Sequence, residues 1–513
     1  MRGSLLVIPL LVGGLGLLAL APITEADSLA YHVSVAIGML NTGAFPSAPE
    51  WFQGRLAGAG EVLIGLGLSI GAEQFGSLLQ FLGLVGIIGI LRHGGWSDQN
   101  RQIPVLLVLL SCPVLIPHVT SPKPFLLPIA MTTTALFLAI TFLHRGDQLA
   151  KSDRRVEIYL LVCLLVMTAS TNKLNFLLSS GLVGLMAFGI MWRQGLGWAA
   201  TGWGLAGFGM IMLPPALWKS AHFGGALWEA MLTPFPGQWP GSGAFHTYLL
   251  SYRDSTWPFP LSLVIPEGLG TMTTVLGVAL FAMILVPRAI REAGPSRIFA
   301  SLSLIVALVA SFLGQRTSRF YLEPLIWLLM ALLAWAPTRR FHIPSWLKVS
   351  MYGQVLASAV MITTGIATLS TGALSNRLRQ DVMMRRASGY QAMNWVDQVA
   401  PVDARIISSS RSIGLLPRHP ISYDWDSYVK GDADRAVYKA LVARQCPNYF
   451  LVEMEVGQKP SIPKETFYVA AGPVTIHAAT RNPFNSGSKS QAWLLGLTQP
   501  PCENGKRSKE SDL

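Results

Sequence analysis

Charged residues are scarce in this chain. Asp, Glu, Lys and Arg make up 13% of its 513 residues, which is about half the share found in a typical soluble domain. Apolar residues account for 51%, and 33 prolines and 15 tryptophans lie among them. Bilayers tolerate the helix breaks that proline makes, and they favour tryptophan as an anchor at the membrane interface. The composition therefore predicts a membrane protein rather than a soluble one.

Motifs for metal or nucleotide binding are also lacking. The chain has four cysteines, no CxxC motif and no His-rich cluster, and its glycine-rich stretches fall inside apolar runs. A net charge of +12 would suit nucleic acid if the basic residues were clustered. They lie instead between apolar runs, so we interpret them as setting orientation in a membrane and expect no nucleic-acid partner.

Apolar runs divide most of the chain into membrane spans. A helix needs roughly 20 residues to cross the hydrocarbon layer, and about eleven runs come near that length. One run is short and another contains Glu323, so the number is approximate. The runs cover residues 3–24, 74–91, 102–120, 124–143, 158–172, 174–192, 195–218, 268–287, 298–315, 320–338 and 349–376. We interpret the first run as a span rather than a cleaved signal peptide, because it is long and Pro22 would follow the cut.

Basic residues predict the orientation of these spans. If the N-terminus lies inside, the short inner segments hold fourteen Lys and Arg residues and the outer loops hold seven. This bias has the direction expected for a cytoplasmic membrane. The loops 25–73 and 219–267 and the C-terminal part are then predicted to lie outside.

The chain changes in character after the last apolar run. Charged residues return, and the pattern predicts helices over 381–399 and 432–443 and strands over 404–409 and 449–453. Such alternation indicates a small α/β domain with a partly parallel sheet. We therefore expect three parts, which are an all-α polytopic membrane domain over 1–376, an extracytoplasmic α/β domain over 377–502 and a disordered tail over 503–513.

Two of the four cysteines fall in the predicted outer domain. Cys446 and Cys502 would meet an oxidising compartment there, which permits a disulfide. Two separate thiols are the alternative, because sequence alone does not give their geometry. Cys112 and Cys163 lie inside apolar runs and are expected to be packing residues.

Acidic residues follow the first span directly. Glu25 and Asp27 lie two positions apart where the chain leaves the bilayer, and Tyr31 and His32 come next. Capping of a helix by Asp27 would be an ordinary structural explanation. Glu61 begins a second polar segment, before a stretch that is expected to lie along the membrane interface.

Basic residues at the same predicted face oppose the general orientation bias. Lys123, Lys173 and Arg319 each lie at the outer end of a span. Such side chains commonly reach for lipid headgroups, and Arg319 has Glu323 one turn away as a possible partner. A cluster of these cations would also hold a phosphate group well.

Several short motifs carry a resemblance to a known family. They are EADSLAYH (25–32), GE (60–61), SPK (121–123), TNK (171–173), SRFYLEP (318–324), NW (394–395), PVDARI (401–406) and YFLV (449–452). In these motifs the chain resembles the polytopic glycosyltransferases of the GT-C type, specifically the bacterial relatives of the dolichyl-phosphate-mannose protein mannosyltransferases. The resemblance extends over most of the chain, and the acidic motif at 25–32 is its most specific part.

The resemblance implies an activity and a reaction centre. Such enzymes transfer a sugar with inversion from a polyprenyl-phosphate carrier to a glycan, lipid or protein acceptor on the outer face. A carboxylate of the first outer loop would take the proton of the acceptor hydroxyl. That catalytic role falls on Asp27, with Glu25 as the alternate. Some members use a divalent metal ion, which Glu25 and Asp27 would have to hold.

The remaining motif residues are assigned to substrate binding by the same resemblance. Lys123, Lys173 and Arg319 would stabilise the charge that grows on the lipid phosphate as it leaves. His32 and Glu61 lie in the matching motifs and are expected to contact the substrate with them.

Two other kinds of protein agree with part of this pattern. A lipid-linked sugar flippase or transporter would not catalyse transfer, but it would be expected to carry ionisable residues at mid-membrane. A surface-polysaccharide ligase or polymerase would share the outer-face site and use a lipid-diphosphate donor.

The predicted topology can be tested with reporter fusions. A phosphatase fused after Asn394 should be active, and a reporter that works only in the cytoplasm should be silent there, because eleven spans from an inner N-terminus end outside. The opposite pattern would mean that the span count is wrong by one.

Overall fold

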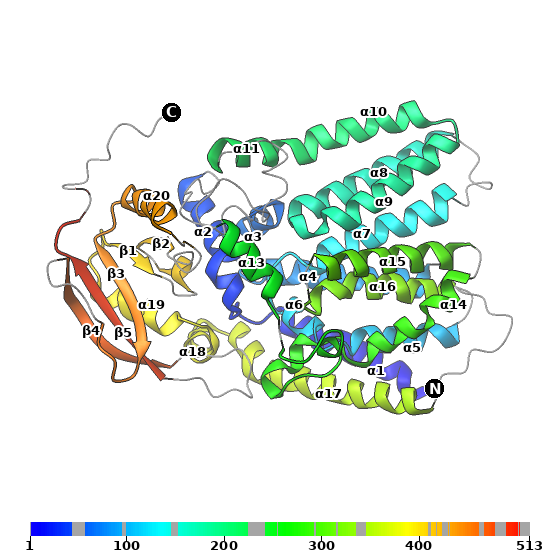
Figure 1. Ribbon diagram of the computed structural model, residues 1–513. Helices are drawn as coiled ribbons and strands as arrows, with labels where there is room; N and C mark the ends of the chain where they lie inside the picture. The colour runs from blue at the N-terminus through cyan, green and yellow to red at the C-terminus, as the bar shows by residue number, and fades with distance from the viewer. Residues whose placement is uncertain are drawn as a thin grey trace.

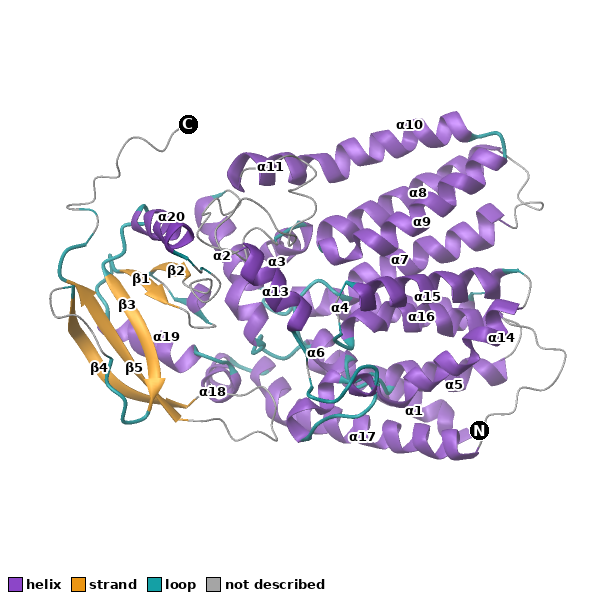
Figure 2. Cartoon of the chain, in the orientation of Figure 1, coloured by secondary structure: helices purple, strands orange, loops and turns teal. Residues whose placement is uncertain are grey.

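Helices make up most of the molecule, and its strands are confined to one end (Figure 1, Figure 2). The computed structural model describes residues 2–43, 57–94, 99–144, 152–223, 242–253, 255–291, 294–313, 316–334, 345–408, 412–416, 418–422, 429, 431–460, 466–477, 489–500 and 502. The predicted tail 503–513 lies outside these residues, as do 44–56 and 224–241 of the predicted outer loops.

The membrane part consists of α-helices joined by shorter helical turns. Its α-helices are α1 (Arg2–Ala19), α2 (Val33–Thr42), α3 (Ala59–Ser69), α4 (Phe75–His93), α5 (Gln99–Leu110), α6 (Leu115–Val119), α7 (Leu126–Leu138), α8 (Ser152–Asn172), α9 (Leu177–Arg193), α10 (Gly197–Gly207), α11 (Leu213–Phe223), α13 (Ser242–Ser251), α14 (Val286–Arg291), α15 (Pro295–Phe312), α16 (Arg319–Ala334) and α17 (Ser345–Leu369). The π- and 3₁₀-helical turns are η1 (Ser28–His32), η3 (Ala139–His144), η5 (Leu174–Phe176), η6 (Phe208–Met212), η7 (Leu261–Leu263), η8 (Leu269–Thr274), η9 (Gly277–Leu285) and η10 (Ser370–Ala373).

Six described helical segments are long and apolar enough to cross a membrane. They are Phe75–His93, Leu126–Leu143, Arg154–Asn172, Leu174–Arg193, Pro295–Phe312 and Ser345–Ala373. Shorter apolar helices occur at Leu6–Ala19, Ala59–Ser69 and Arg101–Leu110. A polytopic, mostly helical membrane protein is thus confirmed, whereas the count of about eleven spans is not.

Breaks interrupt the helix in the predicted runs 102–120 and 268–287. The run 102–120 is interrupted between α5 and α6, where Pro113 cannot continue the helical hydrogen bonds. The run 268–287 forms the 3₁₀-helices η8 and η9 and the start of α14, and Gly277 at the start of η9 has φ +68°. A β-carbon would be strained at that angle. Breaks of this kind show that a charge-free run is not always one continuous helix.

The α17 helix supplies partners for the backbone at these breaks. The Gln354 amide donates to the Ser111 carbonyl at 2.9 Å, and the Ser358 hydroxyl donates to the same carbonyl at 2.6 Å. The Val278 N–H donates to Gln354 Oε1 at 2.6 Å. Irregular backbone within a membrane is tolerated only where such partners exist.

The α16 helix forms the centre of the bundle and is buried on nearly every side. Trp327 is fully buried, and its indole N–H donates to the Thr133 hydroxyl on α7 at 3.3 Å. Glu323 accepts a hydrogen bond from Thr132, also on α7. The suggestion that Glu323 pairs with Arg319 is therefore not supported, because Glu323 points into the bundle toward α7.

A five-stranded sheet forms at the C-terminal end with the order β2-β1-β3-β5-β4. Its strands are β1 (Arg405–Ser408), β2 (His419–Ser422), β3 (Tyr449–Glu455), β4 (Phe467–His477) and β5 (Lys489–Leu497), and its helices are α18 (Asn376–Arg386), α19 (Tyr390–Val399) and α20 (Asp432–Ala443). The β1 strand pairs in parallel with β2 and β3, whereas β5 pairs antiparallel with β3 and β4. The predicted partly parallel sheet is confirmed. The helix predicted over 381–399 is two helices, because Gly389 has φ +75° between them.

The first loop joins this end of the molecule to the bundle. Glu73 accepts the Ile23 N–H at 3.1 Å and pairs with Arg379 of α18 at 2.5 Å. A β-carbon on Gly414, in the turn η11 (Ile413–Leu415), would overlap Ser34 of α2. The N-terminus lies at the opposite end of the bundle from the sheet (Figure 1), an arrangement that the predicted topology requires.

The predicted disulfide is present. Cys446 follows α20 and Cys502 follows β5, and they are bonded across a separation of 56 residues. Cys112 and Cys163 are free, buried thiols, as expected.

We expect the disulfide to be measurable by counting thiols. Unfolded, unreduced protein should take up two labels, at Cys112 and Cys163, and reduced protein should take up four. Replacing Cys446 with Ser should destabilise the C-terminal sheet by roughly 3–4 kcal/mol, because the reduced chain gains loop entropy on unfolding. Four labels without reduction would contradict the bond.

Candidate functional site

The acidic motif after the first span folds into a π-helical turn. The Val33 N–H bonds to the Ser28 carbonyl five residues back, a wide helical turn that often occurs at functional sites. Glu25 caps the turn, because its Oε2 accepts the Ser28 N–H at 2.7 Å and the Ser28 hydroxyl at 2.5 Å. Asp27 makes no capping hydrogen bond. The capping role considered for Asp27 thus belongs to Glu25, which leaves Asp27 available for chemistry.

Lys123 is carried to this turn by an irregular segment that α4 holds in place. Gln80 Oε1 accepts the N–H groups of Phe125 at 2.8 Å and Leu127 at 3.1 Å. A β-carbon on Gly76 would lie 2.5 Å from Pro122, so only glycine permits this approach of α4. The Lys123 backbone therefore has a fixed position opposite the acidic motif.

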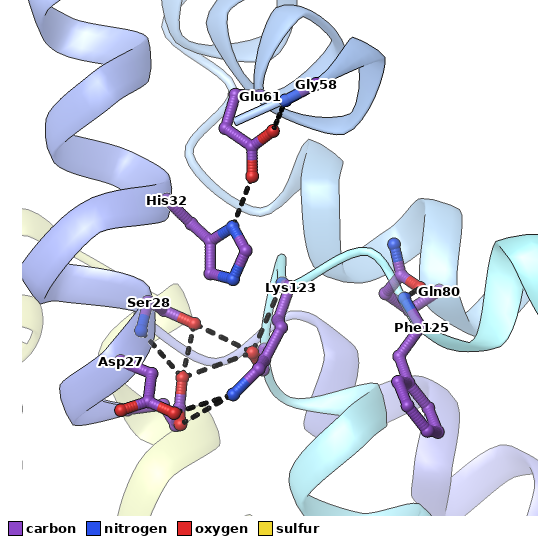
Figure 3. A network of polar contacts seen from close by, with 10 residues as sticks. Asp27, Ser28, His32, Gly58, Glu61, Gln80, Lys123 and Phe125 are labelled. Carbon is purple, nitrogen blue, oxygen red and sulfur yellow. Dashed lines mark hydrogen bonds and ion pairs between the residues drawn. The ribbon is translucent and has the colours of Figure 1, made fainter. Parts of the chain in front are cut away.

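The Lys123 ammonium contacts both carboxylates of the motif (Figure 3). Its Nζ lies 2.7 Å from Asp27 Oδ2 and 3.9 Å from Glu25 Oε1. Lys123 is 4% exposed, whereas the Asp27 side chain is 40% exposed. This exposure leaves Asp27 accessible to a ligand.

The described residues of the site do not fit a divalent metal ion. Among the described residues, no group of three or more His, Cys, Asp and Glu side chains could hold one. Lys123 also supplies the positive charge that Glu25 and Asp27 would otherwise direct at a metal. Two carboxylates that share an ammonium are a poor ligand set for a hard cation.

His32 and Glu61 form a second buried polar pair in the same region. The His32 Nδ1 atom is hydrogen-bonded to Glu61 Oε1, and Glu61 Oε2 accepts the Gly58 N–H at 2.6 Å. Burial lowers the pKa of His32, the contact with Glu61 opposes that change, and the positive charges of Lys173 and Lys123 add to it. The ring is therefore neutral at ordinary pH.

The segments that carry Glu61 and Lys173 are pressed together. A β-carbon on Gly58 would lie 2.1 Å from the Thr171 carbonyl oxygen, and one on Gly60 would lie 2.6 Å from Pro124. Three loops separated widely in the sequence thus meet with no space between their backbones. This close contact brings Lys173 next to the first loop.

Lys173 and Arg319 add positive charge to the site. Lys173 Nζ lies 5.6 Å from the centre of the Phe125 ring. Burial lowers the pKa of Lys173 well below its usual range, and the charges of Lys123 and Arg319 lower it further. Lys173 is therefore close enough to both other cations to be repelled by them, and a bound anion would relieve that repulsion.

Polar atoms without protein partners lie along the segment that leads into Arg319. Among the described residues, buried Thr317 Oγ1, Ser318 Oγ and Arg319 Nε have no hydrogen-bond partner, and neither does Asn172 Oδ1 beside Lys173. Buried polar groups in native proteins are nearly always satisfied. Their presence next to the cations is typical of a site that binds a polar ligand.

Two residues that the sequence interpretation left unassigned also belong here. Burial and the negative charges of Asp27 and Glu25 raise the pKa of Tyr31, so its hydroxyl stays protonated and can donate. Lys219 is 6% exposed, and burial lowers its pKa to about 8, against the charge of Glu61. Lys219 is a basic residue in a predicted outer loop, as Lys123 is. The criterion that selected Lys123 from the sequence would therefore have selected Lys219 as well.

The structure therefore brings the residues named from the sequence into one region. They are Glu25, Asp27, His32, Glu61, Lys123, Lys173 and Arg319. Their contacts are structural observations, whereas their catalytic and binding roles remain predictions.

Comparison with known proteins gives one family and two solved structures. The family model described as the DUF1420 N-terminal domain matches residues 4–383. The crystal structure of ArnT from Cupriavidus metallidurans bound to undecaprenyl phosphate is similar with a TM-score of 0.43 and 12% identity, over 96% of this chain and 97% of that chain. The apo state of the same protein gives a TM-score of 0.39 and 11% identity, over 96% and 98%. No curated protein sequence matches the chain.

The contact at Gly58 provides a test of the site's packing. Gly58→Ala should lower stability by roughly 1–3 kcal/mol, because the new β-carbon would overlap the Thr171 carbonyl and force the loops apart. Gly86→Ala in α4 is the matched control, since nothing lies within 4 Å of its added carbon. Thermal unfolding in detergent measures both, and equal stability of the two variants would contradict the close contact.

Proposed function

We propose, from the chemistry of the site, that this chain, which belongs to the family of the DUF1420 N-terminal domain over residues 4–383, is a membrane glycosyltransferase. It takes a sugar from a polyprenyl-phosphate donor and transfers it with inversion to an acceptor at the outer face of the cytoplasmic membrane. The C-terminal α/β domain lies on that same side.

One observation carries this proposal. A partly exposed carboxylate, Asp27, pairs with the buried Lys123, and Lys173 and Arg319 add positive charge nearby. Glycosyl transfer from a lipid phosphate needs both kinds of group close together, because a proton must be accepted while a phosphate takes up negative charge.

The reaction begins at the acceptor hydroxyl. Its oxygen attacks the anomeric carbon of the donor sugar from the face opposite the phosphate, and its proton passes to the Asp27 carboxylate. The bond between the anomeric carbon and the phosphate oxygen breaks, and its electron pair stays with the phosphate. The products are the glycosylated acceptor with inverted configuration and a free polyprenyl phosphate.

The cations act on the leaving group. Lys173 and Arg319 bind the phosphate oxygens, and the unpartnered polar atoms of Thr317 and Ser318 complete the contacts. Lys123 bridges the two halves of the site, because it holds Asp27 in place and faces the same anion. Charge stabilisation in a site that excludes water is commonly the largest contribution to such a reaction.

A glycosyltransferase can be distinguished from a transporter by measuring whether the donor is cleaved. The full chain in liposomes is supplied with a panel of labelled undecaprenyl-phosphate sugars, and the free undecaprenyl phosphate formed is measured. A transporter or flippase moves the lipid without cleaving the bond from sugar to phosphate. A ligase or polymerase would turn over only the corresponding diphosphate donors.

Asp27 is the residue whose substitution tests the mechanism most directly. Asp27→Asn should leave the protein folded and should lower donor turnover roughly 10²–10⁴-fold, because the amide cannot accept the proton. Glu25→Gln should lose less activity, since the amide oxygen can still accept the Ser28 N–H.

The control is Asp381→Asn, which changes an exposed acid on α18 and should keep full turnover. Full activity of Asp27→Asn at matched expression would remove the catalytic assignment and shift it to Glu25.

A further inference from the structure

His32 and Glu61 form a buried pair in which the carboxylate holds the imidazole in one orientation. His32 is 3% exposed and Glu61 is 1% exposed. Both Glu61 oxygens are engaged, one by His32 Nδ1 and the other by the Gly58 N–H at 2.6 Å. The carboxylate therefore cannot rotate away, and the ring is held in one orientation.

This arrangement determines which ring nitrogen carries the proton. A carboxylate is an acceptor, so a neutral imidazole that contacts it donates from Nδ1. The lone pair then resides on Nε2, and this atom can only accept a hydrogen bond. Burial and the neighbouring charges of Lys123 and Lys173 favour the neutral ring over the doubly protonated one.

The Nε2 atom has no hydrogen-bond partner among the described residues, although it is buried. Figure 3 shows it on the side of the ring away from Glu61, where Ser28 and Lys123 lie. His32 and Ser28 are four residues apart in one helical turn and so share a face of it. A buried acceptor without a partner, placed beside the reacting groups, needs a donor from a ligand.

We propose that His32 Nε2, kept as an acceptor by Glu61, binds a hydroxyl group of the substrate sugar. This inference rests on the proposed function and deepens it. The hydroxyl belongs either to the transferred sugar or to the acceptor, and in both cases the ligand must present an O–H donor at this position. The pair therefore acts in substrate selection and positioning, separate from the proton transfer to Asp27.

Glu61→Gln is the most informative substitution. The new amide can keep the Gly58 contact through its oxygen and donate from its nitrogen to His32 Nδ1, which moves the ring proton to Nε2. The shape of the site is retained, but Nε2 becomes a donor, so the ligand hydroxyl can no longer donate its hydrogen to this atom. The KM for the substrate that carries the hydroxyl should rise roughly 10- to 100-fold.

His32→Gln gives the complementary result. Its side-chain amide can present an acceptor oxygen near the position of Nε2, so part of the affinity should return, whereas His32→Leu should show the full loss. The matched controls are Glu157→Gln and His93→Gln, which change exposed residues at the surface and should leave both KM values unchanged.

The test measures donor turnover and acceptor transfer separately with the full chain in liposomes, using undecaprenyl-phosphate sugars that lack one hydroxyl at a time. One deoxy donor should be a poor substrate for the wild type, and Glu61→Gln should not make it poorer, because both changes remove the same contact between His32 and the hydroxyl. If instead only the acceptor KM responds to Glu61→Gln, the hydroxyl belongs to the acceptor. Wild-type KM values for both substrates in Glu61→Gln would overturn the inference, and so would a raised donor KM that is fully additive with every deoxy donor.

A spectroscopic readout keeps the inference apart from the proposed function. In protein labelled with ¹⁵N-histidine, the signal lost in His32→Gln should report an unprotonated Nε2 in the wild type and a protonated one in Glu61→Gln. Absence of any donor turnover by the wild type would remove the proposed function alone. A protonated Nε2 in the unliganded wild type would overturn the inference regardless of activity.

Discussion

The contact between the Lys123 ammonium and the carboxylates of Asp27 and Glu25 is the interaction on which the site depends. Removing a lone ammonium from water costs on the order of several kcal/mol, so a lysine that is 4% exposed requires these partners. The pair spans 96 residues of sequence and joins the end of the first helix to the segment that follows α6. The Gln80 hydrogen bonds and the glycine contacts at Gly76 hold that segment where the pairing is possible.

The electrostatics of the site follow from this arrangement. Lys123 already has its carboxylates, whereas Lys173 and Arg319 add positive charge, and unpartnered polar atoms lie next to them. This excess of positive charge is localised at one place, where it favours binding of the anionic group of an otherwise apolar lipid. His32 adds no charge to this balance as a neutral ring, whereas the negative charge of Glu61 acts on Lys173 and Lys219.

Irregular backbone interrupts the helical bundle at several places. Such backbone is costly in a membrane unless other groups satisfy it, and the side chains of Gln354, Ser358 and Glu73 do so at separate breaks. Turns are also what allow side chains from several helices to converge, since straight helices present their side chains along their length. The packing of Gly414 against Ser34 places the α/β domain directly over the π-helical turn that carries the acidic motif.

The sequence by itself determined the class of protein, the partly parallel sheet and most of the polar residues of the site. These follow from composition, from periodicity and from the scarcity of charge, which makes each ionisable residue near a span conspicuous. Tertiary structure decided which apolar runs are continuous helices, because the breaks at Pro113 and Gly277 depend on partners supplied by α17. It also decided that Glu25 caps the turn, that Asp27 faces Lys123 and that Glu323 turns toward Thr132. The capping contact of Glu25 is local, but the partners of Asp27 and Glu323 lie 96 and 191 residues away along the chain, so only the packing of distant helices brings them within reach.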